Sequence, residues 1–310
     1  MNNPNKPKNI PVAITFYNRF DRLEACLNSL AACHGSNQTD ILVFLDIGNS
    51  KHGENDIKNT ENITQAFTEF SSLNILASKS NLGASQNAQR ILYYMSTNYE
   101  SFICLEDDVV CDQNFLDIMK GLMNIAQDDD RISSVGAFSP DMQSSNQNFY
   151  LSKYFNGYGV GFWSNSTLIK YLLECHNPYN DLAKAKMENK VLQYHLTLPS
   201  LLKKINKNNK LNDIQATYFN IINDQYQIRP TTSLTTNTGF DGLGINSGYR
   251  DNMPVFIADN ALDKVDPLEV FCLVYDKLLD EKFYRFFREP VKFRARFRHK
   301  ISTIIKSFIR

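Results

Sequence analysis

The feature that most constrains the fold is the alternation of short apolar runs with helix-length amphipathic segments through the first 140 residues. This alternation is typical of βαβ units, in which parallel strands are buried on both faces and joined by crossover helices. It predicts strands at 10–16, 41–46, 73–77, 101–105 and 132–137. It also predicts helices at about 20–33 and 84–97 and a polar, mobile loop at 48–62. We therefore expect an α/β fold with a mostly parallel central sheet flanked by helices.

The composition of this 310-residue chain is that of a folded protein, because 43% of its residues are apolar and 21% are charged. No apolar run reaches the roughly 18 residues of a membrane-spanning helix, and residues 10–16 are too short for the apolar part of a signal peptide. The six cysteines are scattered without a C-x-x-C pair, which favours reduced, buried thiols. We expect a cytoplasmic protein.

Three adjacent carboxylates end the fourth predicted strand, where residues 101–108 read SFICLEDD. Ligands of open α/β sheets bind outside the carboxyl ends of strands, so Glu106, Asp107 and Asp108 are expected at a ligand crevice. A bound cation offsets the repulsion between adjacent carboxylates, and oxygen ligands suit magnesium or manganese, whose coordination a diphosphate can complete. The alternative is that these residues favour the start of the following helix, although Asp112 already supplies a cap there.

Three further segments accompany the triplet. The first strand runs into Tyr17-Asn18-Arg19, and the second ends at Asp46, which is followed by Ile47 and Gly48. In the segment 79–87, Gly83 permits a tight turn into a helix whose N-terminal amides can face an anion.

In this order, the four segments resemble the donor-binding motifs of glycosyltransferases with the GT-A fold. Within that fold the likeness is to the N-acetylglucosaminyltransferase I family and its bacterial relatives, in which a Gly/aromatic segment similar to 155–163 follows the acidic triplet. The resemblance covers about residues 10–115. It implies a Rossmann-like sheet, a divalent metal (manganese or magnesium) and inverting transfer from a nucleotide sugar to a saccharide. The expected donor is a UDP-sugar such as UDP-GlcNAc.

The resemblance also implies roles for individual residues. Asp108 would ligate the metal, Asp107 would contact the ribose or a metal-bound water, and Glu106 would hydrogen-bond the donor sugar. Asp46 would read the base, unless it is a solvated turn residue, and Trp163 would stack on a sugar, unless it lies in the core. The other residues expected to contact the donor are Thr15, Tyr17, Asn18, Arg19, Lys79, Asn81, Gly83 and Asn87.

Inversion requires a carboxylate that accepts the proton of the acceptor hydroxyl. We favour Asp213, because the relatives carry an acidic residue at the start of a helix here, although Asn212 replaces their preceding aromatic residue. Asp213 is also a sound helix N-cap, and the two roles are compatible. Related proteins often place a metal-ligating histidine where this chain has Asn246, so whether Asn246 replaces a metal ligand stays open.

The implied organisation is a disordered N-terminus (1–9), a nucleotide-sugar-binding half (10–135), an acceptor-binding half (136–265) and a basic helical tail (266–310). Residues 282–310 hold ten Lys and Arg against one Glu, which leaves 23 basic and 32 acidic residues elsewhere. Within that region, an apolar stripe among the basic residues of 290–310 predicts an amphipathic helix on an anionic membrane surface. Packing of that helix on the body is the alternative. Nucleic-acid binding is disfavoured because no reading module accompanies the basic run.

The expected activity is therefore that of a hexosyltransferase on the cytoplasmic face of a membrane, acting in bacterial surface polysaccharide or lipid-linked glycan synthesis. A nucleotidyltransferase of similar sheet architecture is one alternative, but residues 12–19 lack the glycine-rich basic loop usual in that class. A non-catalytic scaffold that binds glycan or nucleotide is the other, and the intact triplet argues against it.

Overall fold

The computed structural model describes residues 9–48, 53–140, 142, 147–174, 185–195, 198–203, 205, 212–239, 262 and 264–288. Almost all of the predicted N-terminal segment 1–9, together with Asn246 and the predicted basic helix 290–310, lies outside these ranges. Within the described ranges, no helix is both long and apolar enough to cross a bilayer.

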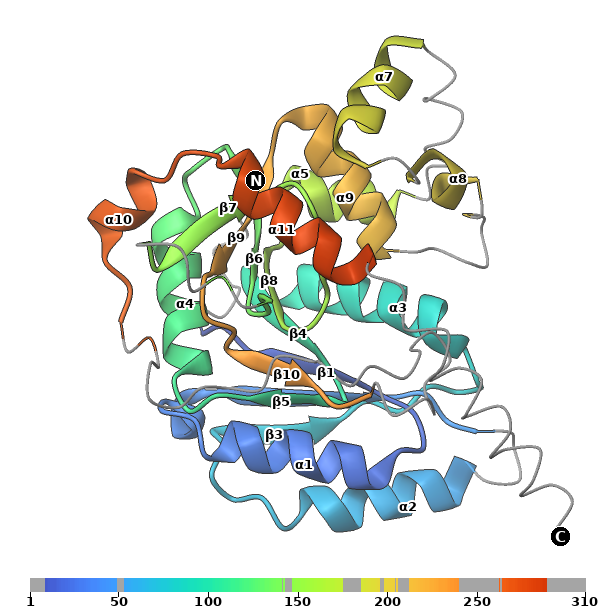
Figure 1. The fold of residues 1–310 in the computed structure, drawn as a ribbon. Helices are drawn as coiled ribbons and strands as arrows, with labels where there is room; N and C mark the ends of the chain where they lie inside the picture. Colours follow the sequence, from blue (N-terminus) through green and yellow to red (C-terminus); the bar gives the residue numbers. More distant parts are fainter. Residues whose placement is uncertain are drawn as a thin grey trace, which may run out of the picture.

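An eight-stranded sheet forms the centre of the molecule, with the order β3-β2-β1-β4-β8-β6-β9-β7 (Figure 1). Its strands are β1 (Val12–Phe16), β2 (Asp40–Leu45), β3 (Ser72–Ile75), β4 (Ser101–Glu106), β6 (Ile132–Gly136), β7 (Phe149–Ser152), β8 (Val160–Trp163) and β9 (Tyr226–Pro230). Only β8 and β7 run against the other strands, because β4 and β6 both pair with β8 in antiparallel fashion and β7 does so with β9. The predicted α/β class and mostly parallel sheet are confirmed, as are the five predicted strands.

Helices cover both faces of the sheet. They are α1 (Phe20–Ala31), α2 (Gly53–Thr64), α3 (Gly83–Asn98), α4 (Phe115–Ala126), α5 (Thr167–Leu173), α7 (Ala185–Tyr194), α8 (Leu198–Leu202), α9 (Asn212–Asn223), α10 (Pro267–Phe271) and α11 (Lys277–Arg288). Apolar side chains of α1 and α4 pack on one face, and those of α3, α5 and α9 pack on the other. In Figure 1, α1 and α2 lie below the sheet and α3 lies above it.

The prediction of a loop at 48–62 was wrong for its greater part, because residues 53–64 form α2. The segment is almost entirely polar and lacks an apolar stripe, so its helical period is hard to recognise from sequence. It packs along α1 and β3 at the margin of the sheet.

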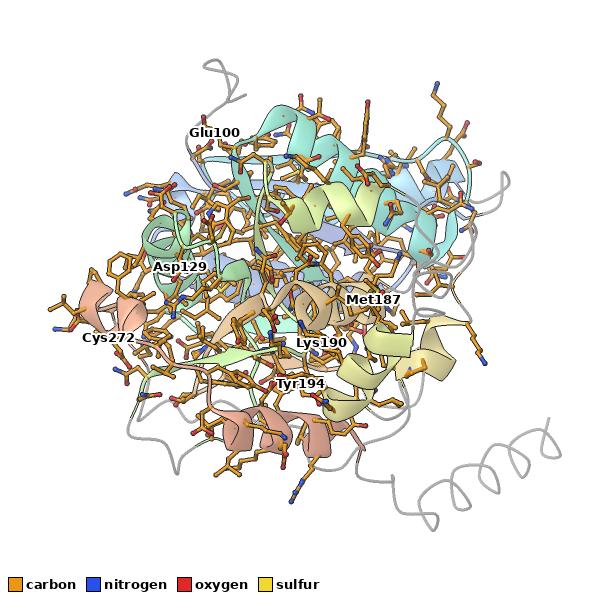
Figure 2. All side chains as sticks on the ribbon, turned by 90° about the horizontal axis from the view of Figure 1, so that it is seen from above. Glu100, Asp129, Met187, Lys190, Tyr194 and Cys272 are labelled. Atoms are coloured by element: carbon orange, nitrogen blue, oxygen red, sulfur yellow. The ribbon has the colours of Figure 1, made fainter. Side chains whose placement is uncertain are left out.

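A layer of helices outside α9 is formed by α7 and α8. Met187, Lys190 and Tyr194, labelled in Figure 2, follow one another at helical spacing along α7. Met187 and Tyr194 pack in a cluster with Ile221, and the Lys190 ammonium donates to the Ile222 carbonyl at 3.1 Å. This layer therefore fixes α9, the helix that carries Asp213.

Strands from both predicted halves share the one sheet. The predicted boundary at residue 135 falls inside β6, and β8, from the second half, pairs with β4, from the first. A second sheet of two strands also joins the halves, because β5 (Val109–Cys111) pairs with β10 (Thr235–Asn237).

The order of strands reverses at β1. From β1 the chain crosses to β2 and β3 on one side, then returns through α3 to β4 on the other side. Both neighbours are parallel to β1, and Thr15 is in register with Glu106 of β4. The carboxyl ends of β1 and β4 therefore meet at a topological switch point, where ligands of open α/β sheets bind.

Candidate functional site

The acidic triplet lies at this switch point. Glu106 is the last residue of β4, and Asp107 and Asp108 form the turn into β5. Both aspartates are buried, with exposed fractions of 2% and 6%. The Asp108 carbonyl accepts hydrogen bonds from the Thr238 amide at 2.7 Å and the Thr238 hydroxyl at 2.9 Å. The residues that follow β10 thus hold the acidic turn in place.

Arg19 reaches the turn from the loop after β1. Its Nη1 donates to Asp108 Oδ2 at 2.8 Å and its Nε to Asp107 Oδ2 at 3.2 Å, while its Nη2 pairs with Asp107 Oδ1. The left-handed backbone of Asn18, with φ of 43°, shapes this loop. Tyr17 also contributes, since its backbone amide bonds the Asp107 carboxylate while its side chain is 40% exposed.

Burial and mutual repulsion raise the proton affinity of the cluster. Burial raises the pKa of Asp107 to about 6, with Asp108 acting in the same direction and Arg19 in the opposite one. The pKa of Glu106 is raised well above its ordinary value, first by burial and then by Asp108, Asp213 and Asp107. The ionised forms of these neighbouring carboxylates therefore destabilise one another at the switch point.

Asp213 faces the same cluster from the first turn of α9. Its carboxylate raises the pKa of Glu106, so the two groups lie close together although α9 and β4 are distant in sequence. A side chain at Gly157 would meet Asp213 Oδ1 at 3.3 Å, so the absence of one leaves room there. Asp213 is exposed to solvent, yet desolvation by the surrounding protein raises its pKa to about 6, against the opposing effect of Arg229.

Asp46 binds the start of α3, whereas the family resemblance implied a contact with the base of the donor. Its carboxylate is buried and accepts hydrogen bonds from the amides of Leu82 and Gly83, each at 2.8 Å, and from the Ser78 hydroxyl at 3.2 Å. Both oxygens are therefore engaged at the start of α3. The side chain joins the end of β2 to that helix, and the same bonds occupy the amides that were expected to face an anion. We do not include Asp46 among the residues proposed to contact the donor.

The other residues predicted around α3 divide into two groups. Asn87 is buried and donates to the Phe44 carbonyl at 3.1 Å and to Thr15 Oγ1 at 3.3 Å, so it links α3 to the sheet. Lys79, Asn81 and Gly83 are exposed. Asn81 donates to the Ile47 carbonyl at 3.0 Å, and Gly83 begins α3 with φ of 75°, which confirms the predicted turn.

Trp163 lies in the core, which is the alternative that the sequence analysis gave to a contact with a sugar. The side chain is 8% exposed and lies in the main apolar core, where its Nε1 donates to the Met123 carbonyl at 3.2 Å. Because β8 runs antiparallel to β4, Trp163 pairs with Ser101, at the end of β4 opposite to Glu106. The reversed direction of β8 thus places the indole far from the acidic turn.

Sequence reasoning missed Asn237, which lies beside the triplet. Its Nδ2 donates to Asp108 Oδ1 at 3.0 Å, and its Oδ1 accepts from the Gly239 amide at 2.7 Å. The signal available in the sequence was its position at the start of the glycine-dense segment 237–248, which also contains Asn246. The pairing of β5 with β10, which places it opposite Val109, has no such signal.

Comparisons with known proteins find partial similarity of fold. No family model and no curated protein matches the chain. Solved structures that share part of the fold include a mannosyltransferase from Pyrobaculum calidifontis in complex with GDP-Man and Mn²⁺, with 10% identity over 70% of this chain and 71% of that one, and a TM-score of 0.42. S. aureus TarS 1–349 in complex with UDP-GlcNAc has 13% identity over 52% and 46% of the two chains, with a TM-score of 0.37. The bifunctional glycosyltransferase WbbM has 15% identity over 56% and 36%, with a TM-score of 0.34. At these values the activity of this chain must be inferred from its own residues.

Proposed function

We propose that this chain is an inverting glycosyltransferase that moves a sugar from a nucleotide-sugar donor, a UDP-sugar such as UDP-GlcNAc, to a saccharide acceptor. The observation that carries the proposal is the convergence of Glu106, Asp107, Asp108 and Arg19 with Asp213 at the switch point of the sheet. These residues come from three distant segments of the chain. Each was expected from the family resemblance to bind the donor, to ligate the metal or to act in catalysis.

The carboxyl groups of Asp213 and Glu106 suit two different roles. Asp213 would accept the proton of the acceptor hydroxyl as the new glycosidic bond forms, and its raised pKa of about 6 makes it a better base than an ordinary aspartate while leaving it mostly ionised at pH 7. Glu106, whose pKa is raised well above its ordinary value chiefly by burial, would hydrogen-bond a hydroxyl of the donor sugar.

The residues present fit a divalent cation that arrives with the donor. Asp107 and Asp108 offer oxygen ligands of the kind that magnesium and manganese prefer. Among the described residues no set of three or more His, Cys, Asp or Glu is arranged to hold a metal, so the diphosphate and water would complete the coordination. When bound, the cation would stabilise the charge of the departing nucleoside diphosphate.

The net charge of the site also favours the binding of a divalent cation. The four carboxylates are opposed by Arg19 and Arg229, so the cluster is acidic before any ligand enters. A diphosphate adds further negative charge to the same crevice. A cation in addition to the two arginines would offset this charge when the donor meets the carboxylates.

Thermal-shift measurements with a panel of nucleotide sugars, each with and without Mn²⁺, test the proposal. A cognate donor raises the melting temperature through mass action, and the rise should depend on Mn²⁺ and disappear in Asp108→Ala. A chain that no nucleotide sugar stabilises, at millimolar concentration with Mn²⁺ present, would refute the assignment.

The acceptor side of the proposal is a saccharide or lipid-linked glycan, presented at a membrane that residues 290–310 bind through anionic lipid. Co-sedimentation with vesicles containing an anionic lipid tests the attachment. A chain ending at residue 289 should lose the binding, whereas equal co-sedimentation of both chains would exclude the tail as the anchor.

A further inference from the structure

Arg19 holds oxygens that a cation would need. Its guanidinium bonds both oxygens of Asp107 and Oδ2 of Asp108, and the remaining oxygen, Asp108 Oδ1, accepts from Asn237. All four oxygens of the pair thus have a donor within the protein. A cation that ligates Asp108 Oδ2 or Asp107 would compete with the guanidinium for these oxygens and would be repelled by its charge.

Arg19 is the partner able to move. Its side chain is 36% exposed, whereas those of Asp107 and Asp108 are 2% and 8% exposed. Asp108 is also tied through its carbonyl to Thr238. Arg19 stands immediately before α1, with no side-chain cap bond to that helix, so moving its guanidinium leaves the helix hydrogen bonds intact.

The guanidinium of Arg19 can bind the diphosphate of the donor once it leaves the aspartates. It stays charged at all relevant pH values, and its planar fork matches the oxygens of a phosphate as well as those of a carboxylate. A diphosphate bound at the switch point would lie within the same crevice, and the cation would by then neutralise the aspartates.

We propose that Arg19 is an internal counter-ion that partly neutralises Asp107 and Asp108 in the donor-free protein, gives up these carboxylates to the divalent cation, and moves to the donor diphosphate. This inference rests on the proposed function and adds to it an exchange of ionic partners. It makes Arg19 a competitor of the cation before the donor binds and a ligand of the donor afterwards.

The exchange is tested by Mn²⁺ binding to the full-length chain, followed through the electron paramagnetic resonance signal of free Mn²⁺, without nucleotide and with UDP. Arg19→Met removes the charge and keeps the length of the side chain. Without nucleotide this variant should bind Mn²⁺ at least about fivefold more tightly than the wild type, the lower end of ordinary coupling between two ligands. With Mn²⁺ present, it should bind UDP more weakly by a similar factor. Arg22→Met, on the first turn of α1, is the matched control and should change neither affinity.

An Arg19→Met variant that binds nucleotide-free Mn²⁺ no more tightly than the wild type overturns the exchange. Tighter Mn²⁺ binding with unchanged UDP affinity overturns the transfer to the diphosphate. If the Met variant does not fold, as judged by circular dichroism, Arg19→Lys serves instead, because its ammonium cannot span both aspartates, and a Lys variant with wild-type Mn²⁺ affinity overturns the exchange. A wild-type chain that binds neither UDP nor any nucleotide sugar refutes the proposed function, and the nucleotide-free Mn²⁺ comparison still decides whether Arg19 is the counter-ion.

Discussion

Replacing Asp213 with Asn tests the assignment of the base most directly. The change preserves the shape of the side chain and its place in the first turn of α9, while removing the only group that we assign to the acceptor proton. Loss of a general base typically lowers kcat by about 10²- to 10⁴-fold, so we expect a fall within that range. Donor affinity should change little, because Asp213 is not among the residues proposed to bind the donor.

The pKa of Asp213 sets the pH dependence of the wild type. Burial raises it from 3.8 to about 6, so the ionised fraction rises from about 10% at pH 5 to about 90% at pH 7. We therefore expect kcat/KM to increase about tenfold over this interval and then level off. The pKa of Asp107 is also raised to about 6, and the variant separates the two groups, because any residual activity of Asp213→Asn that still titrates near pH 6 would report Asp107.

The assay is initial-rate transfer from the donor found by thermal shift, measured from pH 5 to 8, with Asp21→Asn as a control because Asp21 is an exposed carboxylate on α1. A raised folded-state pKa favours the folded protein below pH 3.8, and this contribution is lost as the pH rises through about 6. The Asn variant should therefore be no less stable than the wild type at pH 7.5, and its loss of rate should not reflect unfolding. An Asp213→Asn enzyme that retains more than about a tenth of wild-type kcat would refute the role of Asp213 as the base.

Three further substitutions distinguish chemistry from structure. Asp108→Ala should lower kcat/KM by at least about 100-fold and abolish Mn²⁺-dependent UDP binding, measured by calorimetry. Wild-type UDP affinity in that variant would place the donor elsewhere. Asp46→Ala should lower the free energy of unfolding by about 1–3 kcal/mol, because the amides of Leu82 and Gly83 lose their acceptor, and urea denaturation measures this. Trp163→Phe should lower the free energy of unfolding by about 1–3 kcal/mol and leave the KM for the donor unchanged. A raised KM would indicate that the indole contacts the donor after all.

The parts of the fold that could be predicted from sequence are those set by local pattern. The apolar runs that became β1, β2, β4 and β6 are mostly buried on both faces, so their composition alone marks them as strands, whereas the edge strand β3 is only half-buried. The acidic turn after β4 can also be predicted locally, because three adjacent acidic residues follow an apolar run. The local pattern does not indicate whether a strand runs parallel or antiparallel to its neighbours. The antiparallel direction of β8 decides at which end of the sheet Trp163 lies.

Contacts between distant segments account for the other differences. A strand followed by Asp, a turn and a Gly-led helix is compatible with a base-reading carboxylate and with a helix cap, and only the approach of Leu82 to Asp46 selects the cap. Likewise Arg19 and Asp107 were both expected near the donor. Their direct ion pair joins residues 88 positions apart, and no periodicity in the chain specifies it.

The short pairing between β5 and β10 makes strand register a determinant of which side chain contacts the acidic turn. Asn237 meets Asp108 because Thr235 pairs with Cys111 and Asn237 with Val109. Inserting or deleting a single residue before β10 would present Thr236 or Thr238 at this position and turn the amide to the other side of the strand. Such a change would alter the partner of the acidic turn without touching any residue of the large sheet. Length variation ahead of β10, and not only substitution within the triplet, is therefore a route by which the surroundings of the proposed donor site can change.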